Sequence, residues 1–365
     1  MKIGIPKEVK VKENRVSCTP NGVHQLVKSG HKVYIEANAG QGSGFSNQQY
    51  EQAGGIIVPC AGDAWDADMV IKVKEPIEPE YKFFRKDLLL FTYLHLAAEK
   101  PLTEALCRSG VTGVAYETVQ IGNRLPLLEP MSEIAGRMST LMGCYYLAKP
   151  HGGKGVLLGG IPGVPIGNVL VIGGGTAGLN AARVAAGIGA DVTLLEVDID
   201  KMHFIDISMH GSIRTIYSNE DALLEKLPEV DLLIGAVLIP GAKAPKLIKR
   251  EFLKRMRPGT VFVDIAIDQG GCAETSKATT HDAPIYFEED ILHYCVANMP
   301  GAYARTSTQA LTNSTLPYAV KLANYGFEAF QRLPELYLGV NTFDGAITCE
   351  PVAQAHGMEY RKLQA

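Results

Sequence analysis

The sequence predicts an α/β protein with two domains, one of which contains a doubly wound parallel sheet. At 365 residues the chain is too long for one typical domain and long enough for two hydrophobic cores. Short apolar runs alternate with segments of helical composition, which is the pattern of strands and crossover helices in parallel sheets. One such run, residues 169–172, leads directly into a glycine-rich turn and a further helix.

Composition and charge exclude several classes of partner. The formal net charge is −4 and there are no blocks of like charge, which gives no support for nucleic acid or acidic membranes. The seven cysteines are scattered, odd in number and without a CxxC pair, so we expect a reduced protein with no cysteine-based metal site. The first residues lack a signal-peptide core, and prolines interrupt the most apolar region, residues 155–175. We therefore expect a soluble, cytoplasmic protein.

The first third of the chain predicts its own, mostly parallel sheet. Its predicted strands are the apolar runs at residues 2–5, 32–36, 69–73, 88–91 and 112–115. One predicted helix begins at Pro20 with Thr19 as its cap and ends at Gly30, and another runs from Pro101 to Gly110. Strand and helix thus alternate, as parallel pairing requires.

A second glycine-rich loop, residues 40–45, is interpreted as a turn. Ser46 and Gln49 follow it with the spacing of a capping box, which predicts a short polar helix. Phosphate binding at this loop is the less favoured alternative.

Polar side chains follow three of the predicted strands. Arg15 lies beyond the first strand, Lys74 follows residues 69–73, and Tyr93 and His95 follow residues 88–91. Each has a structural alternative, as a surface ion pair, a loop charge or a core histidine. Ligands bind at the carboxyl edge of a parallel sheet, so together these residues predict a carboxylate clamp and a proton-transfer group.

A long helix is predicted at residues 133–147, with Ser132 as its cap. It leads into a segment rich in glycine and proline, residues 150–153, before the apolar run at 169–172. This change in composition suits a crossing between domains.

The turn after residues 169–172 has the GxGxxG spacing of a dinucleotide-binding site. Gly173 permits the tight turn, Gly175 lets a pyrophosphate approach the backbone, and Gly178 lets helix and strand pack closely. Glu196 ends the next strand, 196 − 178 = 18 positions on, where a carboxylate binds the ribose hydroxyls and repels a 2′-phosphate. We therefore predict NAD rather than NADP as the cofactor. Asp198 is the alternative ribose ligand, and a βαβ turn without a ligand is the structural alternative.

The later strands continue the doubly wound pattern. They are predicted at residues 192–196, 213–216, 231–236, 261–266 and 292–296. Asp264 falls inside one of them and is expected to be structural, whereas Asp268 follows the strand and is expected to face the cleft. A final long helix is predicted at residues 308–325, with a kink at Pro317.

Several motifs of the sequence resemble those of a known family. The chain is similar to the bacterial L-alanine dehydrogenases over essentially its full length. The motifs that carry the resemblance are GIPKE at residues 4–8, ENRV at 13–16, VKEP at 73–76, FTYLHL at 91–96, MSEIAGR at 131–137, VDIAIDQGG at 263–271 and VANMPG at 296–301. Blocks of this length are far more specific than the glycine fingerprint alone.

The resemblance implies a domain plan. An NAD-binding Rossmann domain, residues 130–304, is inserted into a discontinuous substrate domain, residues 1–129 and 305–365, and the subunits form a homohexamer. It also implies that Arg15 and Lys74 hold the substrate carboxylate and that His95 and Asp268 carry out the proton chemistry. The predicted cofactor-binding residues are Ser132, Gly173, Gly175, Thr176, Ala177, Gly178, Glu196, Asp198, Ser218, Val237, Leu238, Ile267, Asp268 and Asn298. The family usually has Asp where this chain has Glu196.

The predicted reaction is therefore the reversible, NAD-dependent conversion of L-alanine to pyruvate and ammonia. An alternative of another class is the NAD(H)-binding subunit of a proton-translocating transhydrogenase, which needs no carboxylate clamp. A third is an NAD-dependent dehydrogenase of a different amino acid.

Overall fold

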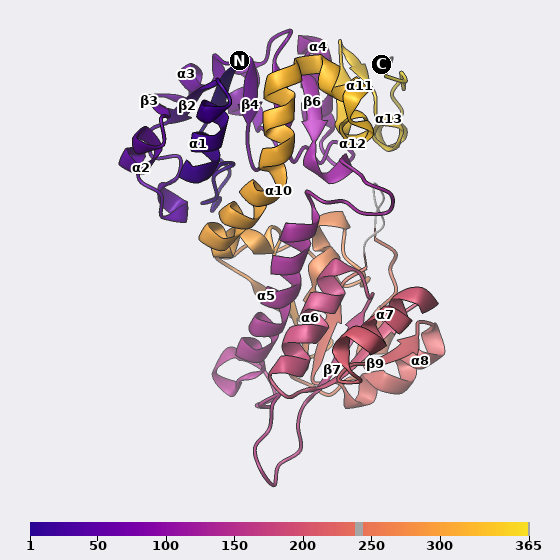
Figure 1. Cartoon of the computed structure of the whole chain (residues 1–365). Coiled ribbons are helices and arrows are strands. Elements are labelled where there is room, and N and C mark those ends of the chain that lie inside the picture. Colours follow the sequence, from indigo (N-terminus) through magenta and orange to yellow (C-terminus); the bar gives the residue numbers. More distant parts are fainter. Residues whose placement is uncertain (238–243, 364–365) are drawn as a thin grey trace. The chain divides into compact units, whose positions relative to one another are not determined.

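The computed structural model describes residues 1–237 and 244–363. The chain divides into two compact units, which we call unit 1 (Met1–Met131 and Gly301–Ala365) and unit 2 (Ser132–Pro300). Both ends of the chain, indigo and yellow in Figure 1, therefore belong to unit 1. The predicted two-domain α/β class is confirmed.

Unit 1 is built on a sheet whose described strands have the order β15-β14-β6-β5-β4-β1-β2-β3. The six strands from the first third of the chain pair in parallel, while β14 pairs antiparallel with both β6 and β15. The strand bounds are β1 Lys2–Ile5, β2 Lys32–Glu36, β3 Ile56–Val58, β4 Met69–Ile71, β5 Leu89–Thr92, β6 Thr112–Ala115, β14 Val340–Phe343 and β15 Ala346–Ile347. The carboxyl ends of β1, β4 and β5, on adjacent strands, thus share one edge.

Two predicted helix starts of unit 1 are confirmed, whereas the helix predicted at residues 308–325 begins four residues earlier, at Ala304. Thr19 caps the first helix by accepting a hydrogen bond from the Gly22 N–H, and the capping box of Ser46 and Gln49 is present. Pro317 lies inside the long C-terminal helix, as predicted. The helix bounds are α1 Pro20–Lys28, α2 Asn47–Gln52, α3 Ala61–Trp65, α4 Lys100–Ser109, α10 Ala304–Tyr325, α11 Ala329–Arg332, α12 Pro334–Gly339 and α13 Glu350–His356.

Unit 2 is a doubly wound sheet whose described strands have the order β12-β13-β11-β10-β7-β8-β9. All neighbours pair in parallel except the edge strand β12. The strand bounds are β7 Asn168–Ile172, β8 Asp191–Glu196, β9 Arg214–Tyr217, β10 Leu232–Gly235, β11 Val261–Asp264, β12 Ile285–Glu288 and β13 Ile291–Tyr294. The strand order reverses between β7 and β10, so ligands are expected at the carboxyl end of β7.

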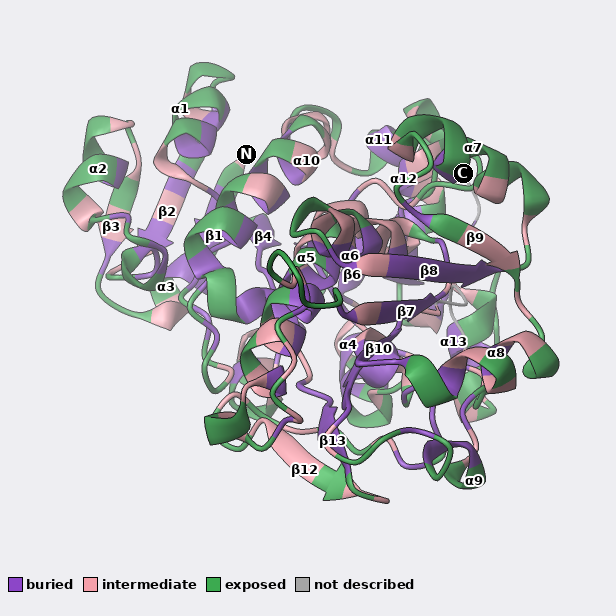
Figure 2. Ribbon diagram, turned by 90° about the horizontal axis from the view of Figure 1, so that it is seen from below, coloured by how far each residue is buried: buried purple, intermediate pink, exposed green. Residues whose placement is uncertain are grey.

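Two hydrophobic cores cover the two faces of this sheet. Val169 and Val171 of β7 enter one core with Ala181 of a neighbouring helix, and Leu170 and Ile172 enter the other. Figure 2 shows the resulting burial of β7 and β8. The helices of unit 2 are α6 Thr176–Gly187, α7 Ile199–Met209, α8 Glu220–Lys226 and α9 Arg250–Leu253, and α5 Glu129–Leu147 continues into unit 2 from unit 1.

Several predicted bounds are wrong, and two of them concern predicted site residues or their neighbours. Ser132 does not cap the long helix, because α5 begins one turn earlier at Glu129 and places Ser132 inside it. Pro130 suits the first turn of a helix, where its missing N–H costs nothing. The strand predicted at residues 261–266 ends at Asp264, and the 3₁₀ helix η6 (Ile265–Gln269) follows.

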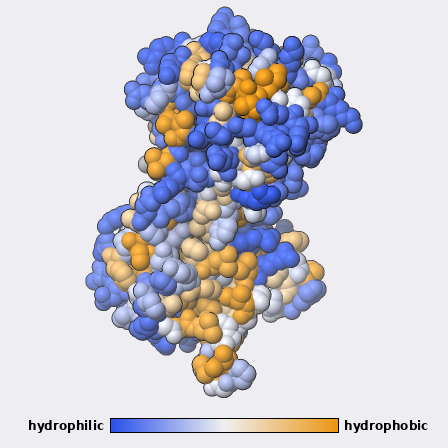
Figure 3. Space-filling model, turned by 90° about the vertical axis from the view of Figure 1, so that its left-hand side faces the viewer, coloured by the Kyte–Doolittle hydropathy of each residue, from blue (hydrophilic) through white to orange (hydrophobic). Residues whose placement is uncertain are grey.

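One loop of unit 2 exposes an unusual number of apolar side chains. Residues 157–166 form a loop that extends from the unit (Figure 1) and contains Leu157, Ile161, Val164 and Ile166, all exposed. Figure 3 shows hydrophobic surface at the tip of this unit. Within residues 1–237 and 244–363, no helix is both long enough and apolar enough to cross a membrane.

Candidate active site

Arg15 is a buried cation held by a buried carboxylate. Its Nε and Nη2 atoms donate to the two oxygens of Glu13, at 2.7 and 2.5 Å, and Nη1 lies 3.1 Å from the sulfur of Met131. Burial alone would lower the pKa of Arg15, but the Glu13 carboxylate outweighs it and raises this pKa. The bidentate pair fixes the plane of the guanidinium and keeps it charged.

Lys74 is buried just beyond the end of β4. The Thr92 hydroxyl donates to its carbonyl oxygen at 3.1 Å, which fixes the backbone against the end of β5. Among the residues that the structure describes, no hydrogen bond or ion pair occupies the Lys74 ammonium. A buried ammonium of this kind is suited to an anionic ligand, because burying a charge is costly until it is paired.

Glu75, next in sequence, is buried and forms an ion pair with Lys10. Burial would raise its pKa, yet Lys74, His95 and Lys10 together lower it below its ordinary value. The charge on Glu75 therefore interacts with both Lys74 and His95, which places these predicted residues in one electrostatic environment.

His95 lies in a strained backbone conformation that a second carboxylate stabilises. Its φ is +49°, and its N–H donates to Glu117 at 2.6 Å, with the N–H of Leu94 donating to the same oxygen at 3.1 Å. The imidazole Nδ1 lies 4.0 Å from that carboxylate, and the ring of Tyr93 stacks on the imidazole with centroids 5.8 Å apart. Strain of this kind clusters at functional sites, where it aims a side chain.

Unit 1 thus brings Arg15, Lys74 and His95 together at one edge of its sheet. Tyr93 interacts electrostatically with Arg15 and stacks on His95, and Glu75 interacts electrostatically with both His95 and Lys74. The arrangement can hold a small carboxylate between two cations beside an imidazole.

In unit 2 the glycine-rich turn connects β7 to α6. Gly173 has a φ of +98°, and a Cβ on Gly178 would collide with the Gly173 carbonyl oxygen. A Cβ on Gly175 would meet nothing within 4 Å, so open space lies next to the start of α6. Thr176 and Ala177 begin that helix, whose first-turn N–H groups have no intrahelical acceptor. The turn is therefore shaped to admit an anion at a helix N-terminus.

Glu196 and Asp198 differ in their surroundings. Glu196 is buried and accepts hydrogen bonds from the N–H groups of Gly174 at 2.7 Å, Val197 at 2.7 Å and Asp198 at 3.1 Å. The Asp198 side chain caps α7 by accepting from the N–H groups of Asp200 and Lys201. Only Glu196 contacts the glycine-rich turn directly.

Asp268 is exposed in η6, directly after β11. The buried Asp264 organises this segment: it accepts from the Ala266 N–H at 3.0 Å, the Cys272 N–H at 2.8 Å and the Ser276 hydroxyl at 2.5 Å. Burial raises the pKa of Asp264 even though these donors favour the carboxylate. Asp264 therefore fixes both ends of the loop that carries Asp268.

The other predicted cofactor-binding residues follow strands of unit 2. The Ser218 N–H donates to the Glu196 carbonyl oxygen at 2.8 Å, Val237 follows β10, Ile267 is buried in η6, and Asn298 has a φ of +65°. Leu238 lies outside the described residues.

Two family models match this chain. The N-terminal domain model "Alanine dehydrogenase/PNT" matches residues 4–135, and the corresponding C-terminal domain model matches residues 139–350. The chain belongs to the alanine dehydrogenase/PNT family. Alanine dehydrogenase 2 of Staphylococcus aureus (strain USA300) is 55% identical over 367 residues, an alignment that covers 100% of this chain and 99% of the relative.

Two solved structures have the same fold. A structure of L-alanine dehydrogenase superimposes with a TM-score of 0.94 at 48% identity, covering 98% of this chain and 99% of that one. The transhydrogenase of Sinorhizobium meliloti superimposes with a TM-score of 0.81 at 24% identity, covering 96% and 99%, and at that identity shows the fold alone.

The sequence analysis missed two carboxylates, Glu13 and Glu117, which bind the predicted site residues Arg15 and His95. Glu13 is part of the ENRV motif, but its position two residues before Arg15 does not by itself indicate that its carboxylate binds the guanidinium. Glu117 lies two residues after β6, and its place at the carboxyl edge could have marked it.

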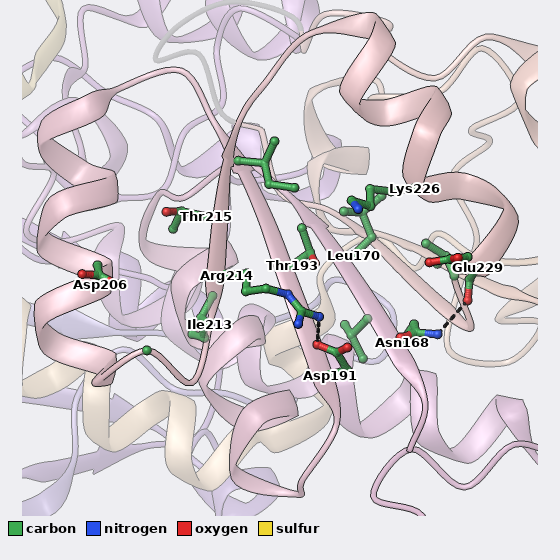
Figure 4. A pocket seen from close by; sticks show the side chains of 14 residues that line it. Asn168, Leu170, Asp191, Thr193, Asp206, Ile213, Arg214, Thr215, Lys226 and Glu229 are labelled. Atoms are coloured by element: carbon green, nitrogen blue, oxygen red, sulfur yellow. Dashed lines mark hydrogen bonds and ion pairs between the residues drawn. The ribbon is translucent and has the colours of Figure 1, made fainter. Parts of the chain in front are cut away.

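A pocket of about 420 Å³ lies away from all predicted site residues. It is lined by residues at the amino ends of β7, β8 and β9 and by α8, the opposite edge from the glycine-rich turn (Figure 4). Both of its cations already have carboxylate partners, since Arg214 pairs with Asp191 and Lys226 with Glu225. We assign no chemistry to it.

Proposed function

We propose that the protein catalyses the reversible, NAD-dependent oxidative deamination of L-alanine to pyruvate and ammonia. The observation that carries this proposal is the pair of buried cations, Arg15 and Lys74, beside His95 in a member of the alanine dehydrogenase/PNT family. A subunit that only binds NAD(H) has no need of such a clamp.

Arg15 and Lys74 bind the substrate carboxylate. The Glu13 pair presents the guanidinium in a fixed plane, and Lys74 contributes the second charge. Holding the carboxylate at two points orients Cα and converts an encounter into a near-attack geometry.

The glycine-rich turn fits NAD. The open space at Gly175 beside the start of α6 admits a pyrophosphate, and Glu196 lies where a carboxylate favours ribose hydroxyls over a 2′-phosphate. The residues that would hold the cofactor are those predicted from the sequence, with Asp198 as the alternative to Glu196. When bound, NAD supplies the hydride acceptor at its nicotinamide ring.

His95 and Asp268 carry out the proton chemistry. After loss of hydride from Cα, the resulting imine is attacked by a water that Asp268 holds. His95 moves the proton that collapse to pyruvate and ammonia requires, since an imidazole can both accept and donate a proton. Asp268→Asn is expected to lower kcat by about a hundredfold or more. Near-normal turnover in this variant would remove Asp268 from the mechanism.

One assay tests the function as a whole. Nicotinamide absorbance is followed with L-alanine, L-serine, glycine and lactate, each with NAD and with NADP. We expect reduction with L-alanine and NAD. No signal with any amino acid would favour the NAD(H)-binding transhydrogenase subunit, and a larger signal with another amino acid would favour a dehydrogenase of that substrate.

The remaining assignments rest on the resemblance. We propose unit 1 as the substrate domain, unit 2 as the NAD domain, a homohexamer as the assembly and the cytoplasm as the location.

A further inference from the structure

Unit 1 buries a second group of charges that the proposed chemistry does not use. Lys72, fully buried, forms ion pairs with Glu8 at 3.0 Å and with Glu80 at 2.9 Å. Burial would lower the pKa of Lys72, but the two carboxylates outweigh it and raise this pKa. Burial also raises the pKa of Glu8, although Lys72 opposes it.

The two carboxylates make similar contacts, each with Lys72 and with one backbone N–H, although only the Glu8 oxygen also forms a hydrogen bond with Lys72. Glu8 uses one oxygen for Lys72 and accepts the Val73 N–H with the other, at 2.6 Å. Glu80, in the 3₁₀ helix η2 (Glu78–Phe83), uses one oxygen for Lys72 and accepts the Ile77 N–H with the other, at 3.0 Å. Both side chains are at most 5% exposed.

Of the two carboxylates, only Glu8 joins the two chain segments that carry the clamp cations, Arg15 and Lys74. Its backbone partner, Val73, directly precedes Lys74, and Glu8 begins the segment that leads to Arg15. Glu8 therefore ties the segment that carries one clamp cation to the segment that carries the other. The Ile77 N–H, bound by Glu80, lies beyond the clamp in sequence.

Stability alone does not explain a charged cluster here. Buried ion pairs are often no more stabilising than apolar side chains of the same volume, because desolvation offsets the attraction. A network of fixed hydrogen bonds does, however, specify one backbone geometry. We propose that Glu8 is a positioning residue that sets the separation of Arg15 and Lys74, and so the affinity for the substrate carboxylate. This inference rests on the proposed function of the same site.

Glu8→Gln and Glu80→Gln form a matched pair for the test. In each variant the amide cannot accept from both Lys72 and a backbone N–H, so each loses one contact of the same kind. For both we measure the KM for pyruvate in the reductive direction, inhibition by oxamate, the Kd of NADH and the melting temperature.

We expect Glu8→Gln to raise the KM for pyruvate and the inhibition constant of oxamate by about tenfold or more, since small displacements of a binding group are costly. Glu80→Gln should change both by less than about threefold, with a similar loss of melting temperature. The Kd of NADH, bound by unit 2, should be unchanged in both.

Equal increases in KM in the two variants would show that the cluster only stabilises unit 1, and no increase in Glu8→Gln would overturn the inference. If Glu8→Gln does not fold, Glu8→Asp keeps the charge but shortens its reach, and the same rise in KM is expected. Failure of the proposed function would appear earlier, as a wild-type protein that does not oxidise NADH with pyruvate and ammonia.

Discussion

Glu196, the last residue of β8, and Asp198, two residues later, have different roles at the proposed cofactor site. Glu196 is buried against the Gly174 N–H, whereas Asp198 caps α7 and is partly exposed. We therefore expect Glu196, the residue nearer the turn, to be the one whose charge acts on a ribose 2′ substituent.

Glu196→Gln is expected to raise the ratio of kcat/KM with NADP to that with NAD by about tenfold, because a neutral side chain no longer repels a 2′-phosphate. Asp198→Asn serves as the matched control and should change the ratio by less than about twofold. Steady-state kinetics with both cofactors measures this ratio. The opposite ranking would assign the ribose to Asp198.

Glu75 makes the stability of unit 1 depend on pH. Because its pKa in the folded protein is lowered from the ordinary value of 4.5, the carboxylate stabilises the fold above that value and loses its contribution as the pH falls through the folded pKa. Wild type should therefore be more stable than Glu75→Gln near pH 7, by about 1 kcal/mol. Urea unfolding from about pH 7 to about pH 3.5 should show this difference closing on acidification. A difference that is constant with pH would contradict the ion-pair explanation.

At the scale of the element, the glycines in the connection from β7 to α6 have separate roles. Gly178 is required for packing, since a Cβ there would collide with the backbone of Gly173, whereas the space beside Gly175 is open to a ligand. Gly187, at the end of α6, has neither constraint.

Three alanine substitutions separate these tasks. Gly178→Ala should destabilise unit 2 by about 2 kcal/mol or more through overpacking. Gly175→Ala should fold normally but weaken NADH binding by about tenfold or more, because its methyl group occupies the pyrophosphate space. Gly187→Ala should be neutral or slightly stabilising. Thermal melts and NADH fluorescence titration distinguish the three. Normal NADH affinity in Gly175→Ala would remove the turn from the cofactor site.

At the scale of the whole molecule, we expect the exposed apolar loop of unit 2, residues 157–166, to be buried by another protein surface. Leu157, Ile161 and Val164 are 70%, 61% and 53% exposed, and residues 155–167 contain no charged side chain. Apolar patches of this kind mark protein interfaces. We expect the loop to be buried in the proposed homohexamer.

Ile161→Asp should therefore reduce the oligomer to a smaller species, because a charge would be buried without a partner. Leu338→Asp, on an exposed apolar residue of unit 1, is the control and should leave the assembly intact. Size-exclusion chromatography with light scattering measures the mass. An unchanged mass for Ile161→Asp would place the subunit contacts elsewhere.

Much of this architecture is predictable from sequence, because parallel strands are continuous apolar runs. β12 was missed since it is a short edge strand joined to β13 by Glu289 and Asp290, both with positive φ, where glycine or asparagine is the usual signal. The hairpin of β14 and β15 does carry such a signal, Asp344-Gly345, and could have been found.

The candidate site, like the fold, could be predicted from the sequence only in part. The positions of Arg15, Lys74 and His95 after strands follow from the pattern of apolar runs. The carboxylates that hold Arg15 and His95, Glu13 and Glu117, do not, because side-chain partners depend on rotamers and on packing from distant segments. The early start of α5 was missed because Ser132, in its first turn, is a typical capping residue, whereas Leu128, which precedes the helix, is not.

The pairing of β14 with β6 has a consequence for synthesis of the chain. Unit 2 is continuous in sequence, so all of its described strands have been made before residues 301–365 appear. Unit 1 cannot complete its sheet until Val340 is available to pair with Val114. Domains fold as units during translation, and distant pairings close slowly. While unit 2 forms, the N-terminal segment of unit 1, Met1–Met131, therefore has an unpaired sheet edge at β6, and we expect this nascent chain to be prone to aggregation.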